Sequence, residues 1–292
     1  MFPLTVLEIE APSLRLGGEV LPSPSKVGLR GRLVCAGPIC GEALTTYGGT
    51  VRLSVKGAIA RSYPGDAQVM ARSGSLVAVV NLDLEDAVAG AVAGEMPGTP
   101  LKSAIDAQAI AARSYYSAHR RRHEAADFCD STHCQFLTAG TAVSRESALR
   151  TRGLVLRYRG EPVPALYFRS CGGRTLRAED VGFASSPYPF AAVDCAACLR
   201  NPAVWTAQFP EEQWTGQHTE AARLELARRF GWDSLRSNDY IERRVAGKVI
   251  VSGKGHGHGV GLCQRGAAGM AAQGADFRSI LRHYFPAASI VE

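Results

Sequence analysis

PLKSAIDAQAIAARSYYSAHRR, residues 100–121, is the clearest helical stretch in the sequence. One stripe of positions recurs with the 3.6-residue period of a helix: Leu101, Ile105, Gln108, Ala112 and Tyr115. Thr99 suits the cap of this helix and Pro100 suits its first turn. Gln108 is the polar exception on the stripe. It is therefore either a satisfied buried amide or a group that orients a ligand beside the helix.

The segments around this helix predict an α+β fold. Residues 1–80 contain β-rich runs separated by Pro, Gly and Ser clusters, which indicates strands and turns. A short helix is expected from near Asp83 to Met96, and further elements follow in mixed order: strands within 153–160, 163–170 and 245–253, and helices within 211–231, 262–274 and 277–286. This order favours a β-rich N-terminal part followed by a mixed α/β core over a regular βαβ repeat.

Charge and composition narrow the class of protein. The 292 residues carry a formal net charge of +6, and a basic surface favours acidic partners. The densest basic run, residues 119–123, also suits a helix C-terminus, and no nucleic-acid motif accompanies it, so nucleic acid is not expected as a partner. No apolar run approaches the ~20 residues of a membrane span, and no signal peptide is visible. The protein either stays inside the cell or has a leader that this sequence lacks.

Eight cysteines fall into suggestive groups. Cys195 and Cys198 form a C-x2-C pair, and CDSTHC at 129–134 contains two more. Cys35 and Cys40 lie five apart, and the other two, Cys171 and Cys263, stand alone. Such pairs indicate a metal site in a cytosolic protein, whereas disulfides compete in an exported one.

GKGHGHGVGLCQRGA, residues 253–267, contains five strictly alternating glycines. In an extended chain these glycines share one face, and His256 and His258 lie on the other. Neither a dinucleotide-binding loop nor a Walker loop fits this spacing. Two histidines within such a ladder favour a functional role, either metal binding or a place in a cleft.

Other catalytic patterns fail. SCGGRT at 170–175 lacks the G-x-S-x-G of a serine nucleophile, and H-E-x-x-H is absent, which weighs against a zinc hydrolase. A cysteine protease would use Cys134 or Cys171, but no neighbouring sequence favours either as a nucleophile.

Long motifs in one order resemble the sporulation stage II protein D family, also called SpoIID/LytB. They are GEMP, QAIAARSYY, CDSTHCQ, GLVLRYRGEPVPALYFRSCGGRT, PYPFAAVDCAAC with a later Trp205, GHGHGVGLCQRGAAGMA and ILRHYFP. The resemblance covers about residues 75–290. It implies a catalytic domain over 76–292 with a glycan-binding cleft, and a leading β-rich part over 1–75 of the same unit.

The resemblance also implies the activity of a peptidoglycan lytic transglycosylase, a lyase that cleaves the MurNAc–GlcNAc bond and leaves 1,6-anhydro-MurNAc ends. Glu95 matches the catalytic acid of the family's E-M-P motif. It is the only charged residue in AVAGEMPGTP, 91–100, where small apolar neighbours suit a general acid. One carboxylate suffices because the sugar's own 6-hydroxyl attacks the anomeric carbon. Asp106, Asp127 and Asp130 would matter only for hydrolysis.

By motif position, the resemblance implies a set of substrate-binding residues: Gln108, Arg113, Tyr116, Thr132, Gln135, Tyr167, Ser170 and His258. Arg113 is expected to hold a carboxylate of the substrate, and Tyr167 to stack on a sugar face. Some relatives carry zinc on the CDSTHC-like loop, and the chemistry needs no cofactor. A structural zinc site is therefore expected from Cys129, Cys134, Cys195 and Cys198, with His123, His133 and Cys171 as alternates and disulfides as the rival.

Two other functions remain open at this point. Relatives described as amidase enhancers bind the wall or a partner amidase without cutting glycan, and a zinc-dependent hydrolase would use the His and Cys cluster. The expected partners are peptidoglycan glycan strands and, for the enhancer, a cell-wall amidase. The substrate implies a location in the cell envelope.

Overall fold

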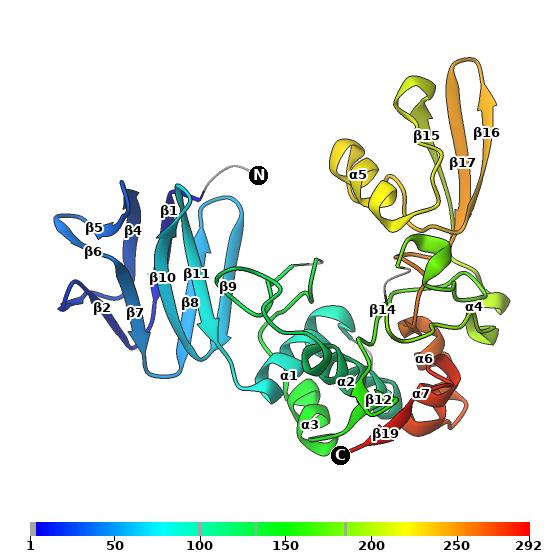
Figure 1. The fold of residues 1–292 in the computed structure, drawn as a ribbon, viewed down its shortest axis with the longest axis horizontal. Helices are drawn as coiled ribbons and strands as arrows, with labels where there is room; N and C mark the ends of the chain where they lie inside the picture. The colour runs from blue at the N-terminus through cyan, green and yellow to red at the C-terminus, as the bar shows by residue number, and fades with distance from the viewer. Residues whose placement is uncertain (1–3, 99–100, 132, 184–185) are drawn as a thin grey trace. The chain divides into compact units, whose positions relative to one another are not determined.

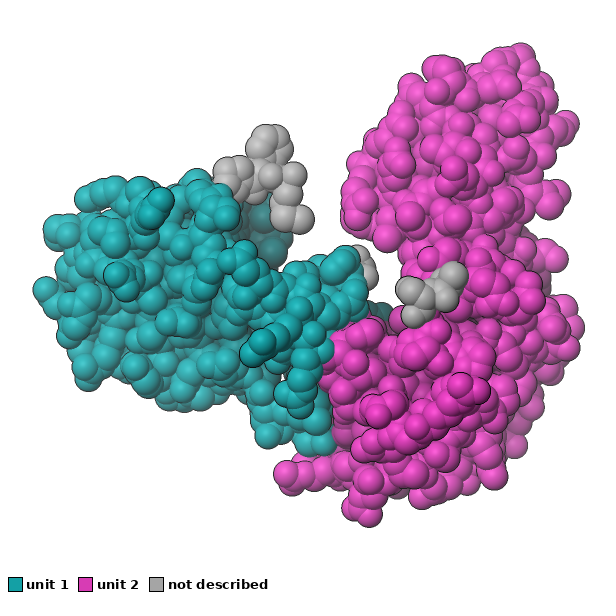
Figure 2. All heavy atoms as spheres, in the orientation of Figure 1, with its two compact units in different colours: residues 1–95, 120–146 teal, residues 96–119, 147–292 magenta. Residues whose placement is uncertain are grey.

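The computed structural model describes residues 4–98, 101–131, 133–183 and 186–292. The predicted helix cap at Thr99 and Pro100 and the predicted site residue Thr132 lie outside these ranges. The chain has the predicted α+β fold, with a β-rich N-terminal part. It divides into two compact units (Figure 2): unit 1 comprises residues 1–95 and 120–146, and unit 2 comprises residues 96–119 and 147–292.

Unit 1 contains two antiparallel sheets around one core. The six-stranded sheet has the order β6-β5-β4-β1-β8-β9 and the five-stranded sheet the order β11-β10-β7-β2-β3 (Figure 1). Their bounds are β1 Val6–Glu10, β2 Ser13–Leu16, β3 Glu19–Leu21, β4 Ser25–Arg30, β5 Leu33–Ala36, β6 Ile39–Gly41, β7 Ala43–Tyr47, β8 Thr50–Val55, β9 Ile59–Pro64, β10 Asp66–Arg72 and β11 Ser75–Asn81.

Period-2 burial explains why these segments are strands. In β1, Leu7 and Ile9 are buried between exposed neighbours, and they pack in one cluster with Leu14 of β2 and Leu44 of β7. Alternation of this kind leaves one face of a sheet for the core. The sheet extends through β11 to Asn81, in agreement with the strands predicted within residues 1–80.

Two helices complete unit 1 or lie at its edge. α1 (Leu84–Glu95) agrees with the prediction and ends where Met96-Pro97-Gly98 begins. Asp83 caps it, because its Oδ1 accepts the backbone N–H of Glu85 at 2.8 Å. α3 (Ala142–Arg150) was not predicted, and the boundary between the units falls within it.

Unit 2 is built around α2 (Lys102–Ala118), the predicted helix. Every residue from Ala104 to Tyr116 is buried, so the helix is covered on all sides rather than along one stripe. Its alanines let β12 (Val155–Tyr158), α6 (Gln264–Ala272) and α7 (Phe277–Tyr284) pack closely against it. The basic run at 119–123 begins directly after its last residue.

The other elements of unit 2 are short or form a separate small sheet. β15 (Val204–Pro210), β17 (Lys248–Lys254) and β16 (Tyr240–Val245) form that sheet, and its core includes Leu226 of α5 (Glu220–Phe230). The short elements are β13 Glu161–Pro162, β14 Tyr167–Phe168, η1 Glu179–Val181, α4 Ala196–Arg200, η2 Glu211–Gln213, β18 Leu262–Cys263 and β19 Ser289–Val291. Among the helices of the described ranges, none has the length and hydropathy needed to cross a membrane.

The glycine ladder departs from the prediction. β17 ends at Lys254, and Gly255, Gly257, Gly259 and Gly261 have φ angles of +85°, +105°, +87° and +82°. The ladder is therefore not an extended strand with one bare face, because glycine adopts such angles readily and other residues do not. A Cβ on Gly257 would lie 2.9 Å from the Cβ of Phe168, and one on Gly259 would lie 2.8 Å from Leu176 Cδ1. The glycines serve close packing against residues 166–176.

Replacing Gly257 tests this packing. We expect Gly257→Ala to lower the free energy of unfolding of unit 2 by about 3 kcal/mol, because backbone strain and a steric clash add together. Gly247→Ala is the matched control. Gly247 also has positive φ, +72°, but a Cβ there meets nothing within 4 Å, so we expect about 1 kcal/mol.

Urea denaturation monitored by tryptophan fluorescence measures both losses. All three tryptophans lie in unit 2: Trp205, Trp214 and Trp232. Equal destabilisation by the two substitutions would contradict the close approach of Gly257 to Phe168.

Candidate functional site

Glu95 is the last residue of α1 and is half-buried. Two glycines, four residues apart on one face of this helix, let residues 136–138 lie against it. A Cβ on Gly94 would be 2.9 Å from Phe136 Cδ1, and one on Gly90 would be 2.9 Å from Leu137 Cδ2. The backbone N–H of Thr138 also donates to the carbonyl of Gly90 at 3.2 Å. The turn that carries Glu95 is thereby fixed against the segment that follows CDSTHC.

Asp130 attaches that segment to the six-stranded sheet. Its Oδ2 accepts hydrogen bonds from Arg61 Nη1, at 2.5 Å, and from the hydroxyl of Tyr63, both on β9. Its Oδ1 accepts the backbone N–H of Leu137 at 2.8 Å. Burial raises the pKa of Tyr63, so the hydroxyl stays protonated and donates to the carboxylate. Arg61 also lies 4.6 Å from the ring centroid of Phe136.

The CDSTHC loop brings four metal-binding side chains together. The ligand atoms of His123, Cys129, His133 and Cys134 all lie within 4.8 Å of one another. His123 Nε2 is 3.3 Å from Cys134 Sγ, and His133 Nδ1 is 3.6 Å from Cys129 Sγ. A tetrahedral zinc bound by two imidazoles and two thiolates separates its ligand atoms by roughly 3.5 Å. The donor set and its spacing therefore fit zinc.

A second cluster lies in unit 2, and it corrects the predicted metal set. Cys195 and Cys198 meet Cys171 and Cys263, with all four sulfurs within 4.8 Å of one another. The structure does not bring the predicted set of Cys129, Cys134, Cys195 and Cys198 together, because its two pairs belong to different clusters. The alternates His123 and His133 belong to the first cluster and the alternate Cys171 to the second. Cys263 was not predicted, since its partners are distant in sequence.

Cys35 and Cys40 form a disulfide between the paired strands β5 and β6.

Within the four-cysteine cluster, a hydrogen bond with Cys171 lowers the pKa of Cys195 to about 6. Hydrogen bonds with Cys195 and Cys198 raise the pKa of Cys171, and those with the other three cysteines raise the pKa of Cys263.

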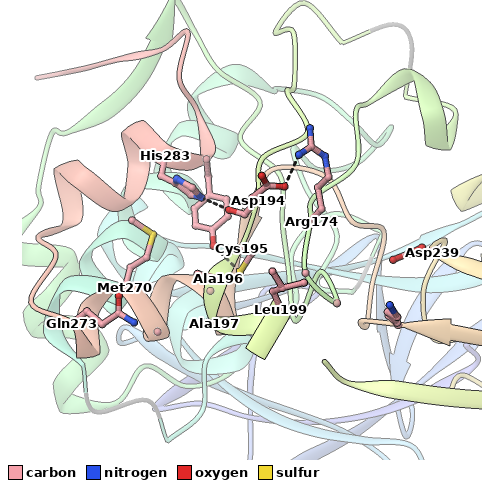
Figure 3. Close-up of a pocket in the computed structure, with 16 residues that line it drawn as sticks. Arg174, Asp194, Cys195, Ala196, Ala197, Leu199, Asp239, Met270, Gln273 and His283 are labelled. Atoms are coloured by element: carbon pink, nitrogen blue, oxygen red, sulfur yellow. Dashed lines mark hydrogen bonds and ion pairs between the residues drawn. The ribbon is translucent and has the colours of Figure 1, made fainter. Parts of the chain in front are cut away.

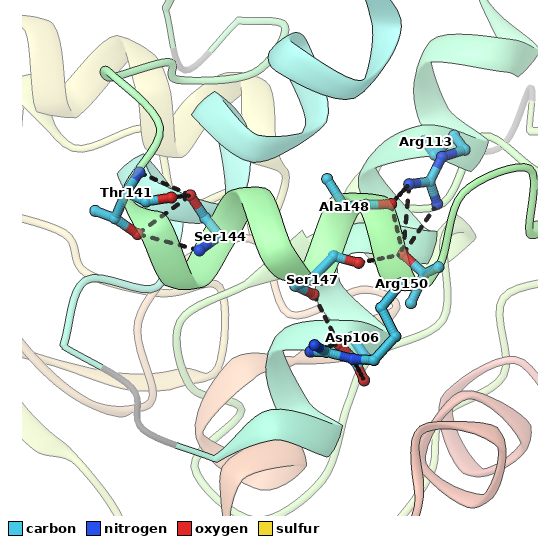
Figure 4. Close-up of polar contacts among 8 residues, drawn as sticks. Asp106, Arg113, Thr141, Ser144, Ser147, Ala148 and Arg150 are labelled. Atoms are coloured by element: carbon cyan, nitrogen blue, oxygen red, sulfur yellow. Dashed lines mark hydrogen bonds and ion pairs between the residues drawn. The ribbon is translucent and has the colours of Figure 1, made fainter.

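Arg113, which is predicted to hold a substrate carboxylate, also contributes to the fold. Its side chain is buried, with 1% of the residue exposed, and its guanidinium donates to the carbonyl of Ala148 at 3.0 Å (Figure 4). It donates to the carbonyl of Leu154 at 3.2 Å as well. It also reaches Thr151 Oγ1 at 3.4 Å. Arg113 therefore satisfies carbonyls at the end of α3 and in the following turn, and its predicted contact with a substrate carboxylate stays a prediction.

Asp106, on the same helix, is also committed to the fold. Its carboxylate accepts two hydrogen bonds from Arg150, at 3.0 and 2.6 Å, and one from Ser147 Oγ at 2.7 Å (Figure 4). Asp127 is exposed, and its Oδ1 accepts the backbone N–H of Arg121 at 2.9 Å.

The remaining predicted residues of α2 and of the loop are buried. Gln108 is fully buried, and neither atom of its amide has a hydrogen-bond partner among the described residues. Tyr116 on α2 and Gln135 after the loop are buried as well. An unsatisfied buried amide costs about 1–3 kcal/mol; Asn238 and Gln264 also have a buried amide atom without a hydrogen-bond partner among the described residues.

His258 is held by its own surroundings. Its Nδ1 accepts the backbone N–H of Val260 at 3.1 Å, so Nε2 carries the proton and donates to the carbonyl of Tyr167 at 3.0 Å. The ring packs near Phe168 and Phe183, at centroid distances of 5.3 and 5.7 Å, and burial lowers its pKa. Both ring nitrogens of the neutral imidazole are thus used within unit 2, which supports a structural role for His258.

Ser170 also belongs to the framework. Its backbone pairs with His256 through bonds of 3.2 and 2.7 Å, and its buried hydroxyl lies 3.6 Å from Cys198 Sγ. The structure therefore brings Tyr167, Ser170 and His258 together, but as a packed junction between residues 166–176 and the glycine ladder.

A cavity of about 520 Å³ lies elsewhere in unit 2 (Figure 3). Arg174, Asp194 and His283 lie at its wall, where Arg174 pairs with Asp194 at 2.5 Å and His283 contacts the Asp194 carbonyl at 2.8 Å. None of the described residues predicted to bind substrate lines it. The cavity was not predicted, since its walls come from segments far apart in sequence.

Comparisons with known proteins point to one family. Residues 72–158 match the family described as SpoIID, Stage II sporulation protein. The chain is 29% identical to the Stage II sporulation protein D of Bacillus amyloliquefaciens, over 73% of this chain and 76% of that protein. It is 26% identical to the protein of the same name in Bacillus subtilis, over the same shares. It is also 22% identical to the Amidase enhancer of Bacillus subtilis, over 69% of this chain and 40% of that protein.

The role of Asp130 predicts a local effect of its removal. We expect Asp130→Asn to lower the opening free energy of the Leu137 amide by about 2 kcal/mol, because hydrogen bonds to a charged acceptor are lost. Hydrogen exchange of residues 129–138 measures this change. Asp127→Asn, a change of the same kind at an exposed position, should leave the exchange of Leu137 unaltered. Equal exchange in both variants would contradict the attachment of the segment through Asp130.

Proposed function

This chain belongs to the SpoIID/LytB family, and we propose that it is a peptidoglycan lytic transglycosylase with Glu95 as its general acid and base. Membership of the family supports a role in the bacterial cell wall. The position of Glu95 supports the specific transglycosylase reaction. It is the motif glutamate, half-buried at the end of α1, within the matched residues 72–158.

The reaction needs one carboxyl group that acts twice. Protonated Glu95 gives its proton to the glycosidic oxygen as the bond between that oxygen and the anomeric carbon of MurNAc breaks. The resulting carboxylate then takes the proton of the 6-hydroxyl of the same sugar. The 6-oxygen closes onto the anomeric carbon, which forms the 1,6-anhydro ring and returns Glu95 to its protonated form. Water is neither consumed nor released.

The state of the other carboxylates supports this reaction over hydrolysis. Hydrolytic glycosidases use a second carboxylate to activate water or to form a covalent intermediate. Asp106 is paired with Arg150, and Asp130 with Arg61 and Tyr63. Asp127 is exposed and bound to the backbone of Arg121. Asp106 and Asp130 are therefore used by the fold, and the proposed reaction needs only the motif carboxylate of Glu95 and no second one.

We propose a smaller set of substrate-binding residues than the motifs imply. Gln108 is retained, because its buried amide lacks a partner among the described residues and a substrate hydroxyl would satisfy it. Tyr116, Gln135 and Tyr167 are retained by motif position. For Ser170 and His258 we propose a role in the fold, since their polar atoms contact other residues of unit 2, and Arg113 also donates to a backbone carbonyl there.

We also propose that zinc on His123, Cys129, His133 and Cys134 is structural. Four protein ligands fill a tetrahedral ion, whereas a catalytic zinc keeps a position open for water. A zinc-dependent hydrolase is therefore disfavoured. The site would order the loop that packs on α1 next to Glu95. The disulfide of Cys35 and Cys40 is typical of oxidising compartments and supports a place outside the cytoplasm.

The similarity to the Amidase enhancer of Bacillus subtilis favours one second candidate, a non-catalytic protein that binds the wall or stimulates a partner amidase. The intact GEMP motif favours the enzyme. Product analysis on purified glycan strands separates the two, because only the enzyme releases fragments without an amidase.

Glu95→Gln tests the proposal. We expect normal folding, retained glycan binding and a loss of cleavage of at least ~10²-fold, because general acid–base catalysis contributes about that much. Mass spectrometry of the wild-type products should show anhydro ends, lighter by one water than reducing ends. Glu124→Gln is the control, since Glu124 is an exposed residue of unit 1. Full activity of Glu95→Gln would remove the mechanism.

Metal removal from the loop gives a separate prediction. A Cys129→Ser/Cys134→Ser variant should lose one zinc per chain by elemental analysis, because thiolates are replaced by poor ligands. Its loop should exchange amide hydrogens faster, and its cleavage should fall without being abolished, as the ion orders the loop but takes no part in the reaction. Unchanged zinc content would contradict the assignment of these ligands.

A further inference from the structure

The four-cysteine cluster of unit 2 is the strongest feature that the proposed function does not use. Cys171 follows β14, Cys195 precedes α4, Cys198 lies within α4, and Cys263 ends β18 just before α6. These residues are between 0% and 3% exposed. Three segments far apart in sequence thus direct thiols at one buried point.

We propose that Cys171, Cys195, Cys198 and Cys263 bind a single zinc ion, separate from the loop site and structural in role. The sulfurs all lie within 4.8 Å of one another, and Cys198 and Cys263 are 3.6 Å apart. Zinc–thiolate bonds of about 2.3 Å in a tetrahedron separate sulfurs by roughly 3.8 Å. The spacing of the four thiols is that of a mononuclear site.

Competing explanations fit the spacing less well. An iron–sulfur cluster places its own irons and sulfides between the thiolates, which holds the cysteine sulfurs further apart. Buried cysteines also occur as small apolar side chains, but four of them then have no reason to direct every sulfur at one point. All four are free thiols in the structure, so no disulfide accounts for their approach.

The surroundings supply donors for thiolates. The backbone N–H of Gly266 donates to Cys263 Sγ at 3.3 Å, and the hydroxyl of Tyr284 lies 3.4 Å from Cys195 Sγ. Such outer contacts orient metal ligands and stabilise their charge. A Cβ on Gly266 would collide with the Tyr284 hydroxyl and with Cys195 Sγ. The glycine at the start of α6 is therefore explained by the same site.

The site would join the parts of unit 2 that lack long regular elements. Cys171 lies beside Ser170, whose backbone pairs with His256 of the glycine ladder, and Cys263 follows that ladder directly. The N–H of Cys195 donates to the carbonyl of Gly173 at 2.8 Å. One ion would thus hold the turn after β14, helix α4 and the start of α6 together, which is the usual function of a closed zinc site.

Elemental analysis of the full-length protein, purified without added chelator, tests the proposal. We expect two zinc ions per wild-type chain and one in a Cys129→Ser/Cys134→Ser variant, which keeps the cluster of unit 2 intact. X-ray absorption at the zinc edge of that variant should show four sulfur ligands at about 2.3 Å. A Cys198→Ser/Cys263→Ser variant should lose the other ion and retain mixed nitrogen and sulfur ligation.

Two results would overturn the proposal. One is a loop variant without zinc, or with nitrogen ligands around the remaining ion. The other is mass-spectrometric detection of disulfides among these four cysteines in the wild-type protein. Both readouts use chains with an intact cluster, so poor folding of Cys198→Ser/Cys263→Ser does not affect them. Failure of the transglycosylase proposal leaves this test unchanged, because no measurement here depends on activity.

Discussion

Close approach between backbone segments at glycine and alanine is the constraint on which both units depend. In unit 1, Gly90 and Gly94 let residues 136–138 lie against α1, and this contact fixes the turn that carries Glu95. In unit 2, the glycines from 255 to 261 let the ladder pack on residues 166–176. A β-carbon at most of these positions would meet another atom within 3 Å, so the packing requires its absence rather than merely tolerating it.

The buried charged side chains likewise have hydrogen-bond partners within the fold. Asp106, Asp130 and Arg113 are all buried or half-buried, and each has named partners that explain its burial. Buried charges are stable only when they are paired and hydrogen-bonded. Asp106 and Asp130 are thus used by the fold, and the proposed chemistry rests on Glu95 because of its place in the motif. A single acid–base group suits a reaction in which the substrate supplies its own nucleophile.

Local patterns in the sequence predicted the elements that local physics determines. The helix from Leu84 to Glu95 follows from its Ala-rich composition and the Met-Pro-Gly stop, and the buried helix α2 follows from its periodicity. The positive φ angles of the ladder were missed, because alternating glycines read the same way in a strand as in a chain of left-handed turns. The burial of Arg113 was missed as well, since its partners come from α3 and the turn that follows it. The sequence of α3 has only a weak helical pattern of its own.

The sequence did not predict which cysteines meet, because residues far apart in the chain come together in one cluster. The C-x2-C and CDSTHC pairs were recognised as metal ligands by type, but each pair finds its partners within its own unit. Cys263 joins Cys171 only through the packing of the ladder, which no spacing rule encodes. The motif glutamate, by contrast, needs no distant partner to be recognised, because its neighbours in the sequence already mark it.

Cleavage of purified glycan strands in water labelled with heavy oxygen tests the central claim most directly. If Glu95 acts alone and the 6-hydroxyl is the nucleophile, every new MurNAc end is anhydro and none carries the label. Labelled reducing ends would show that water attacks the anomeric carbon, which requires a second activating group and contradicts the account.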